Sequence, residues 1–129
     1  MRKQSYKDLE VYQLAHRLAI QIHKMTLENL PKFEMYEQGS QIRRSSKSIV
    51  SVVVEGFGRK QYQQEYIKFL TYAIASCDET KEHLDLLFGT HSLTDEGLFH
   101  ALSEGYQELG RKLFFFRDTI SNDLKHKAL

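Results

Sequence analysis

Residues 42–58 carry the most ambiguous local signal in the chain, and they read Ile42-Arg-Arg-Ser-Ser-Lys-Ser-Ile-Val-Ser-Val-Val-Val-Glu-Gly-Phe-Gly58. The run of β-branched valines near its end, taken alone, favours a strand. Small or apolar residues nevertheless recur at helical spacing through and before this segment: Met35, Ile42, Ser46, Ile49 and Val53. Gly56 and Gly58 supply a C-terminal stop signal for a helix. We therefore predict a helix over about residues 34–55.

The same helical spacing predicts three further helices in the chain: about residues 6–29, 61–89 and 94–122. Ser5 and Asp8 form a capping-box pattern at the first of them, and Pro31 forces its end. Gly89 ends the third helix, and the polar tail from Asn122 is expected to fray. Because the connections are short, the fold class predicted is all-α, an antiparallel up-and-down four-helix bundle.

Composition agrees with a single helical domain over residues 1–129. One Pro and seven Gly are too few for an all-β chain, which needs frequent turn residues. Lys and Arg number 18 against 17 Asp and Glu, so the net charge is only +1. Overall charge therefore gives no sign of a polyanionic partner, and any basic site has to arise from clustering.

The sequence also bears on the cellular compartment. Cys77 is the only cysteine and has no partner for an internal disulfide, so we expect a reducing, cytoplasmic environment. No apolar run follows the basic first residues, so we expect no signal peptide. No run of about 18 apolar residues is present, so we predict no membrane-spanning helix and no membrane partner.

Two of the predicted helices have more apolar surface than one bundle core needs. At about 100° per residue, Val50 and Val54 lie roughly 80 to 100° or more from the centre of their helix's apolar stripe. Phe114, Phe115 and Phe116 are consecutive and fan across about 200°. We predict that Val50, Val54, Phe114 and Phe115 form a homo-oligomer interface. The alternative is that a wide buried face or neighbouring loops cover these side chains.

Basic residues cluster near the same helix, and they form a candidate nucleic-acid-binding set: Arg43, Arg44, Lys47, Arg59 and Lys60. Arg43 and Lys47 share a helix face, whereas Arg44 is turned by about 100°. Such a strip can neutralise phosphates and release counterions. Three basic residues of the last helix could extend it: Arg111, Lys112 and Arg117. The alternative is a solvated face, or ion pairs with acids such as Glu37 or Glu55.

Sequence signals for catalysis or for a cofactor are lacking. A di-metal carboxylate bundle needs Glu-x-x-His on two helices, and Glu79-Thr-Lys-Glu-His83 does not fit that spacing. Cys77 lies on an apolar stripe, where a small buried thiol is the usual finding. The serines of residues 42–58 have no nucleophile elbow or partner histidine. We predict no catalytic residue, no metal, no cofactor and no enzymatic activity.

With these residues in view, the chain resembles the four-helix-bundle family of proteins encoded within intervening sequences of bacterial large-subunit ribosomal RNA genes. Residues 41–59 fit the pattern Gln-hydrophobic-Arg-Arg-Ala-x-x-Ser-Ile-Pro-Ser-Asn-Ile-Ala-Glu-Gly-x-x-Arg, with Val50 in place of Pro and Val52 in place of Asn. Three shorter segments match as well: Lys7-Asp-Leu-Glu-Val-Tyr-Gln-Leu-Ala15, Tyr66-Ile-Lys-Phe-Leu70 and Glu108-Leu-Gly-Arg-Lys-Leu113. The loss of Pro implies a milder helix kink in this chain.

The resemblance also implies an assembly and a class of partner. The same fold is shared with the accessory variability determinant of diversity-generating retroelements, a homopentamer that binds nucleic acid and a reverse transcriptase. The resemblance thus implies a pentameric ring with basic residues available for RNA or DNA, and a reverse transcriptase or another nucleic-acid-handling protein as partner. The second hypothesis is a structural or protein-interaction scaffold with no nucleic-acid ligand.

Overall fold

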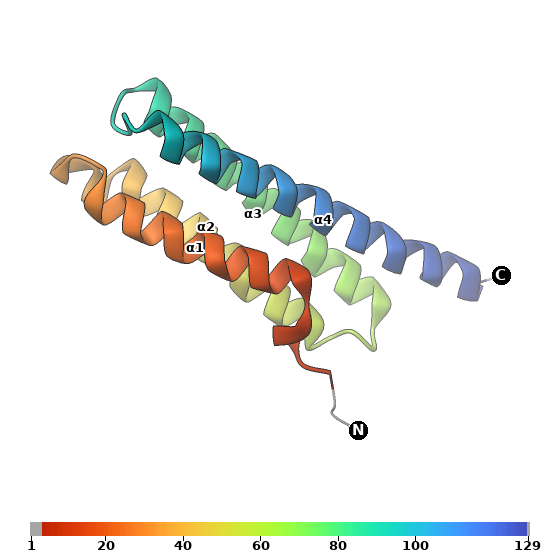
Figure 1. Ribbon diagram of the computed structural model, residues 1–129. Coiled ribbons are helices and arrows are strands. Elements are labelled where there is room, and N and C mark those ends of the chain that lie inside the picture. The colour runs from red at the N-terminus through yellow and green to blue at the C-terminus, as the bar shows by residue number, and fades with distance from the viewer. Residues whose placement is uncertain (1–3, 129) are drawn as a thin grey trace.

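A computed structural model describes residues 4–128 and shows four α-helices (Figure 1). Their bounds are α1 Glu10–Glu28, α2 Gln38–Phe57, α3 Gln63–Gly89 and α4 Glu96–Ala128. Two short 3₁₀ helices precede α1 and α2: η1 Tyr6–Asp8 and η2 Lys32–Tyr36. No strand occurs in these residues, so the prediction of an all-α four-helix bundle is confirmed.

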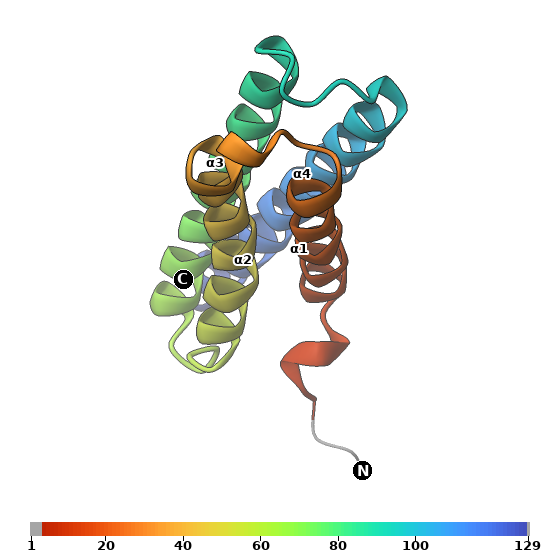
Figure 2. The same ribbon diagram turned by 90° about the vertical axis from the view of Figure 1, so that its left-hand side faces the viewer.

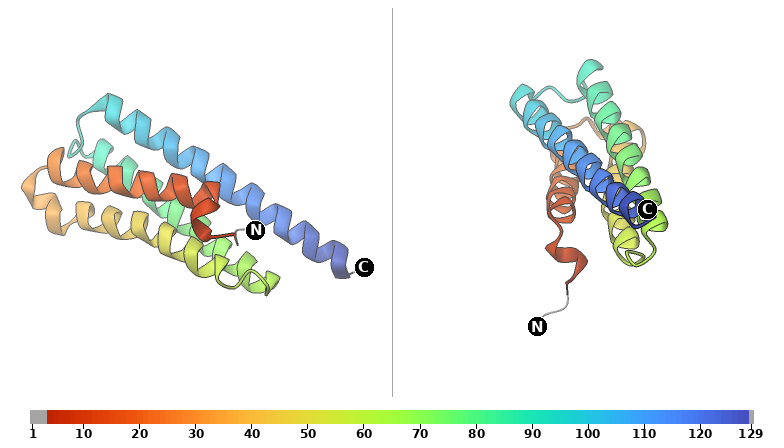
Figure 3. Two further views of the ribbon diagram at one scale, coloured as in Figure 1. Left: turned by 60° about the horizontal axis from the view of Figure 1, so that its bottom comes forward. Right: turned by 90° about the vertical axis from the view of Figure 1, so that its right-hand side faces the viewer.

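The helices follow one another around the bundle in chain order. α2 packs against α1 and α3, and α4 packs against α3 and α1. Figure 2 looks from the end that carries the α1–α2 and α3–α4 connections. The α2–α3 loop lies at the opposite end, beside the start of α1, and α4 runs past it (Figure 3). The α1–α2 pair and the α3–α4 pair therefore form opposite sides of the molecule.

The bundle has one continuous apolar core, built largely from the stripes that the helical spacing predicts. The valine-rich end of α2 is helical, and Val53 is fully buried. The predicted stop role of Gly56 was wrong, because the helix continues through it to Phe57. A Cβ atom at Gly56 would lie 3.0 Å from the Phe69 Cβ atom and 3.3 Å from the Tyr66 ring. Gly56 therefore allows α2 to approach α3 closely.

The starts of the first two helices differ from the prediction. The Ser5 capping box forms, but it caps η1; the chain is extended at Leu9, and α1 begins only at Glu10. Residues 34–36 lie in η2, and the non-helical backbone of Glu37 separates them from α2. The buried Glu34 carboxylate accepts from the Gln38 N–H at 3.1 Å and from the Ser92 hydroxyl at 2.6 Å, so it stabilises this break.

The last two helices also start slightly later than predicted, and the prediction for the end of α4 was wrong. The Asp95 carboxylate accepts from the Leu98 N–H at 3.0 Å and caps α4. The helix then continues past Asn122 to Ala128. Ile120 is buried and Leu124, one turn later, is half-buried, so the apolar stripe extends beyond the polar residues that indicated fraying.

No helix in residues 4–128 is long and apolar enough to span a bilayer, as the sequence predicts.

Candidate functional site

Arg43 differs from its basic neighbours on α2. Its guanidinium donates a hydrogen bond from Nη2 to the main-chain oxygen of Met35 in η2. Its Nη1 atom is buried and has no hydrogen-bond partner among the described residues. The structure thus places Arg43 in the packing between α2 and η2, whereas Arg44 and Lys47 are exposed.

The predicted basic set is divided along the molecule. Arg44 and Lys47 lie midway along α2, whereas Arg59 and Lys60 lie in the α2–α3 loop at the end of the bundle. At 1.5 Å per residue, Lys47 and Arg59 are separated by about 18 Å of backbone. The structure therefore contains two exposed basic sites where the sequence indicates one strip.

The four exposed cations of the set have no ion-pair partner in residues 4–128. The bases that do form ion pairs there include Lys68 with Glu65, Lys81 with Asp78, and Lys112 with Glu10 and Glu108. The alternative ion pairs with Glu37 or Glu55 are absent from the described residues. Instead, Arg59 donates from Nη1 to the main-chain oxygen of Glu55 at 2.9 Å.

Aromatic rings surround the cations of the α2–α3 loop. The Arg59 Cζ atom lies 4.6 Å from the centre of the Phe69 ring, and the Lys60 Nζ atom lies 4.1 Å from the Phe57 ring. Phe69 in turn contacts the Tyr72 ring edge-on, at 5.8 Å between centroids. We use the term basic–aromatic surface for these residues: Arg59, Lys60, Tyr62, Lys68, Phe69 and Tyr72. Helical spacing alone assigned Tyr62 and Phe69 to the apolar stripe of the third helix and did not indicate this surface.

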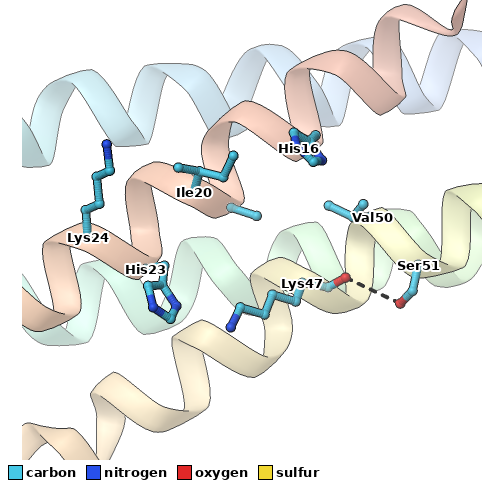
Figure 4. Close-up of a pocket in the computed structure, with 8 residues that line it drawn as sticks. His16, Ile20, His23, Lys24, Lys47, Val50 and Ser51 are labelled. Atoms are coloured by element: carbon cyan, nitrogen blue, oxygen red, sulfur yellow. Dashed lines mark hydrogen bonds between the residues drawn. The ribbon is translucent and has the colours of Figure 1, made fainter. Parts of the chain in front are cut away.

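A groove of about 370 Å³ runs between α1 and α2 (Figure 4). Ile20 and Val50 give it apolar walls, and Lys47 is at its rim. Ile20 is 47% exposed, although the sequence analysis did not single it out. Val50, a predicted interface residue, is half-buried and lines this open groove as well as contacting the core. Val50 is thus covered in part by the core, and the exposed apolar side chain of this groove is Ile20 of α1.

The three consecutive phenylalanines of α4 separate as the helical geometry predicts. Phe116 turns inward and meets the Tyr66 ring edge-on at 5.6 Å between centroids. Phe114 and Phe115 are 48% and 63% exposed, and both line a second groove, between α3 and α4. The fourth predicted interface residue, Val54, is half-buried.

Comparison with known proteins establishes the family of this chain. Residues 7–114 match the family model described as 23S rRNA-intervening sequence protein. The chain belongs to the 23S rRNA-intervening sequence protein family. This confirms the resemblance drawn from residues 41–59, and the match covers most of the bundle.

A solved structure shares the fold of this chain. It is a Bacteroides thetaiotaomicron protein of unknown function from the S23 ribosomal protein family. The TM-score is 0.75 at 22% identity, over 84% of this chain and 95% of the other. At this identity the likeness shows the fold alone. No curated protein matches the chain at a significant level.

Two buried polar contacts join helices inside the bundle. The buried hydroxyls of Ser45 and Thr80 lie 2.8 Å apart and join α2 to α3. The Cys77 thiol donates to the Tyr106 main-chain oxygen at 3.4 Å, and burial raises the pKa of the thiol to about 11. A buried thiol of this pKa is a poor nucleophile at neutral pH. No group of three or more metal-binding side chains occurs in residues 4–128.

Proposed function

We propose that the chain is a non-enzymatic, self-assembling protein that binds nucleic acid. The observation that carries the proposal is the set of four exposed cations without an ion-pair partner in the described residues: Arg44, Lys47, Arg59 and Lys60. These four are distinguished by their grouping on α2 and the loop after it, because most other Lys and Arg of the described residues also form no ion pair. Unpaired cations on an exposed surface favour a phosphate backbone as ligand, because binding then releases condensed counterions.

The test is a salt titration of binding to a structured RNA, followed by fluorescence anisotropy. In the double variant Arg59→Gln, Lys60→Gln, two phosphate contacts are lost, so the slope of log K against log salt should fall by about 1.4 to 1.8. The pair Arg44→Gln, Lys47→Gln tests the α2 site in the same way.

The matched control removes the same charge from ion-paired bases. Lys81→Gln with Lys112→Gln also lowers the net charge by two, but both ammonium groups already face carboxylates, at 3.3 and 3.4 Å. This control should keep most of the affinity. The proposal fails if the protein does not bind RNA at low salt, or if the control variant loses as much affinity as the test variants.

Self-assembly is supported by two separate apolar surfaces of the bundle. The groove with Ile20 and Val50 lies between α1 and α2, whereas Phe114 and Phe115 project from α4 into the groove beside α3, and Phe115 also lines a groove beside η1 and α1. Two different patches can join copies head to tail, and such contacts form a ring when the rotation between copies closes. The pentameric number rests on the resemblance to the accessory variability determinant.

Sedimentation at micromolar concentration tests the assembly. The wild-type chain should form a closed oligomer, and Phe115→Ser or Ile20→Ser should shift it towards monomer. Phe33→Ser is the control, because Phe33 is 65% exposed but lies at the α1–α2 connection, away from both patches. A wild-type monomer under these conditions contradicts the proposal.

The α1–α2 groove favours a second candidate function, a scaffold for a protein partner such as a reverse transcriptase. The exposed surface of its walls is mainly apolar, which suits a protein side chain, and Lys24 and Lys47 line it as well. Capture of a purified reverse transcriptase, unchanged by the Arg59 and Lys60 substitutions but lost in Ile20→Ser, would favour this function over nucleic-acid binding.

A further inference from the structure

The cations of the basic–aromatic surface are interleaved with rings. Arg59 and Lys60 each lie over a phenylalanine, Phe69 and Phe57, at 4.6 and 4.1 Å. The Lys68 Nζ atom lies 5.7 Å from the centre of the same Phe69 ring. Cation–π contacts of this kind hold long basic side chains in place over the surface. Positive charge and flat apolar surface are therefore presented together at the α2–α3 end of the bundle.

Two tyrosines of this surface have rings that the core does not use. Tyr62 is 62% exposed and Tyr72 is 50% exposed. Tyr72 is oriented by its edge-on contact with Phe69, the ring that Arg59 covers. Tyr62 follows a tight turn closed by its own N–H, which donates to the Arg59 main-chain oxygen at 2.8 Å. Both rings are thus attached to ordered backbone and remain open to solvent.

Exposed rings beside unpaired cations distinguish between forms of nucleic acid. In a duplex the faces of the bases are stacked on one another, and only the phosphates and groove edges can be contacted. In a single strand the bases can stack on aromatic side chains while the backbone follows a basic surface. A ligand that used only the phosphates of a duplex would leave Tyr62 and Tyr72 without a role.

We propose that the basic–aromatic surface binds single-stranded nucleic acid, with unpaired bases stacked on Tyr62 and Tyr72 and phosphates held by Arg59 and Lys60. Lys68 has a smaller part, because its ammonium group is paired with Glu65 at 2.9 Å. This inference rests on the proposed nucleic-acid binding and specifies its ligand. It places the single strand along the α2–α3 loop and the first half of α3.

The test compares oligo-rU, oligo-dT and an RNA duplex of equal length by anisotropy at fixed salt. The single strands should bind more tightly than the duplex. The comparison of rU with dT shows whether the protein distinguishes ribose from deoxyribose. Tyr62→Leu and Tyr72→Leu should each weaken single-strand binding by about fivefold or more, since stacking on one ring contributes about 5- to 150-fold. Neither should change the salt slope, because no phosphate contact is lost.

Other tyrosine substitutions in the chain serve as matched controls. Tyr62→Phe and Tyr72→Phe keep the ring and should keep the affinity. Tyr36→Leu removes a ring that is 91% exposed at the opposite end of the bundle, and it should have no effect. The chain has no tryptophan, so its emission comes from seven tyrosines, of which Tyr62 and Tyr72 lie on this surface. Quenching by oligo-rU should decrease in the Tyr62→Leu, Tyr72→Leu double variant.

The outcomes separate this inference from the function it rests on. If the leucine variants bind single strands like wild type while Arg59→Gln with Lys60→Gln loses binding, stacking is refuted and nucleic-acid binding stands. A duplex bound more tightly than either single strand also overturns the inference. If no nucleic acid binds at low salt, the proposed function and the inference fail together.

Discussion

Replacing Thr80 with Val tests the hydroxyl pair that joins α2 to α3 inside the core. Thr80 is fully buried and Ser45 is 2% exposed, so neither hydroxyl has water as a substitute partner. The Thr80 Oγ1 atom lies 2.8 Å from both the Ser45 Oγ atom and the Ser76 main-chain oxygen. The Ser45 hydroxyl otherwise reaches only the Ile42 oxygen, at 3.3 Å. Each hydroxyl has a single proton, so the two depend on each other.

The expected loss in the free energy of unfolding depends on which hydrogen-bond partner the remaining hydroxyl keeps. Thr80→Val leaves Ser45 with one long hydrogen bond, so the free energy of unfolding should fall by about 1 to 2 kcal/mol. Ser45→Ala leaves Thr80 bonded to Ser76 and should cost about 0.5 to 1 kcal/mol. The double variant loses the shared bond once, so it should cost less than the sum by about 0.5 to 1 kcal/mol.

Urea unfolding followed by circular dichroism, at one fixed protein concentration, measures the stability of the wild type, the two single variants and the double variant. Thr119→Val is the matched control, because Thr119 is exposed and donates only to the Phe115 main-chain oxygen, at 3.0 Å. It should change stability by no more than about 0.5 kcal/mol. Additivity of the Ser45 and Thr80 substitutions within about 0.3 kcal/mol would refute the reasoning.

Two further predictions concern the core and its pH dependence. Gly39→Ala should destabilise the chain by about 1 to 3 kcal/mol, because the new Cβ atom would lie 2.4 Å from the Glu34 main-chain oxygen. In Gly97→Ala the new Cβ atom would have no neighbour closer than 3.6 Å, so the free energy of unfolding should stay the same or rise. Equal urea midpoints for the two variants would contradict this account. Burial raises the pKa of the Cys77 thiol from 9.0 to about 11, so the folded state holds that proton more tightly. This stabilisation is complete below about pH 9 and is lost as the pH rises towards 11; Cys77→Ala should therefore lose less stability than wild type between pH 8 and 10.

Sequence spacing identified the helices better than their ends. The end of α4 was missed because polar residues after Asn122 hid the half-buried Leu124, which continues the stripe from Ile120. The break before α2 was missed because it depends on the buried Glu34 carboxylate, whose partner Ser92 is 58 residues away in the chain. Local propensity contains no information on such a distant contact.

The candidate site was likewise predictable from the sequence only in part. The basic residues near α2 were visible as a cluster in the sequence, but sequence position could not distinguish Arg43, which contacts η2, from the exposed Arg44. The contact of Phe69 with both Arg59 and Tyr72 joins the loop to α3 and was equally invisible. The outward direction of Phe114 and Phe115 was predictable, because it follows from helix geometry alone.

The amino-acid sequence by itself determined the all-α class, the number of helices, their inward faces and the family. These depend on residue type and on helical periodicity, which are properties of neighbouring positions along the chain. The tertiary structure alone decided which cations are unpaired, which rings stand beside them and where apolar grooves remain open. These depend on side chains from different helices, and only packing of the bundle brings such side chains within a few ångströms of one another.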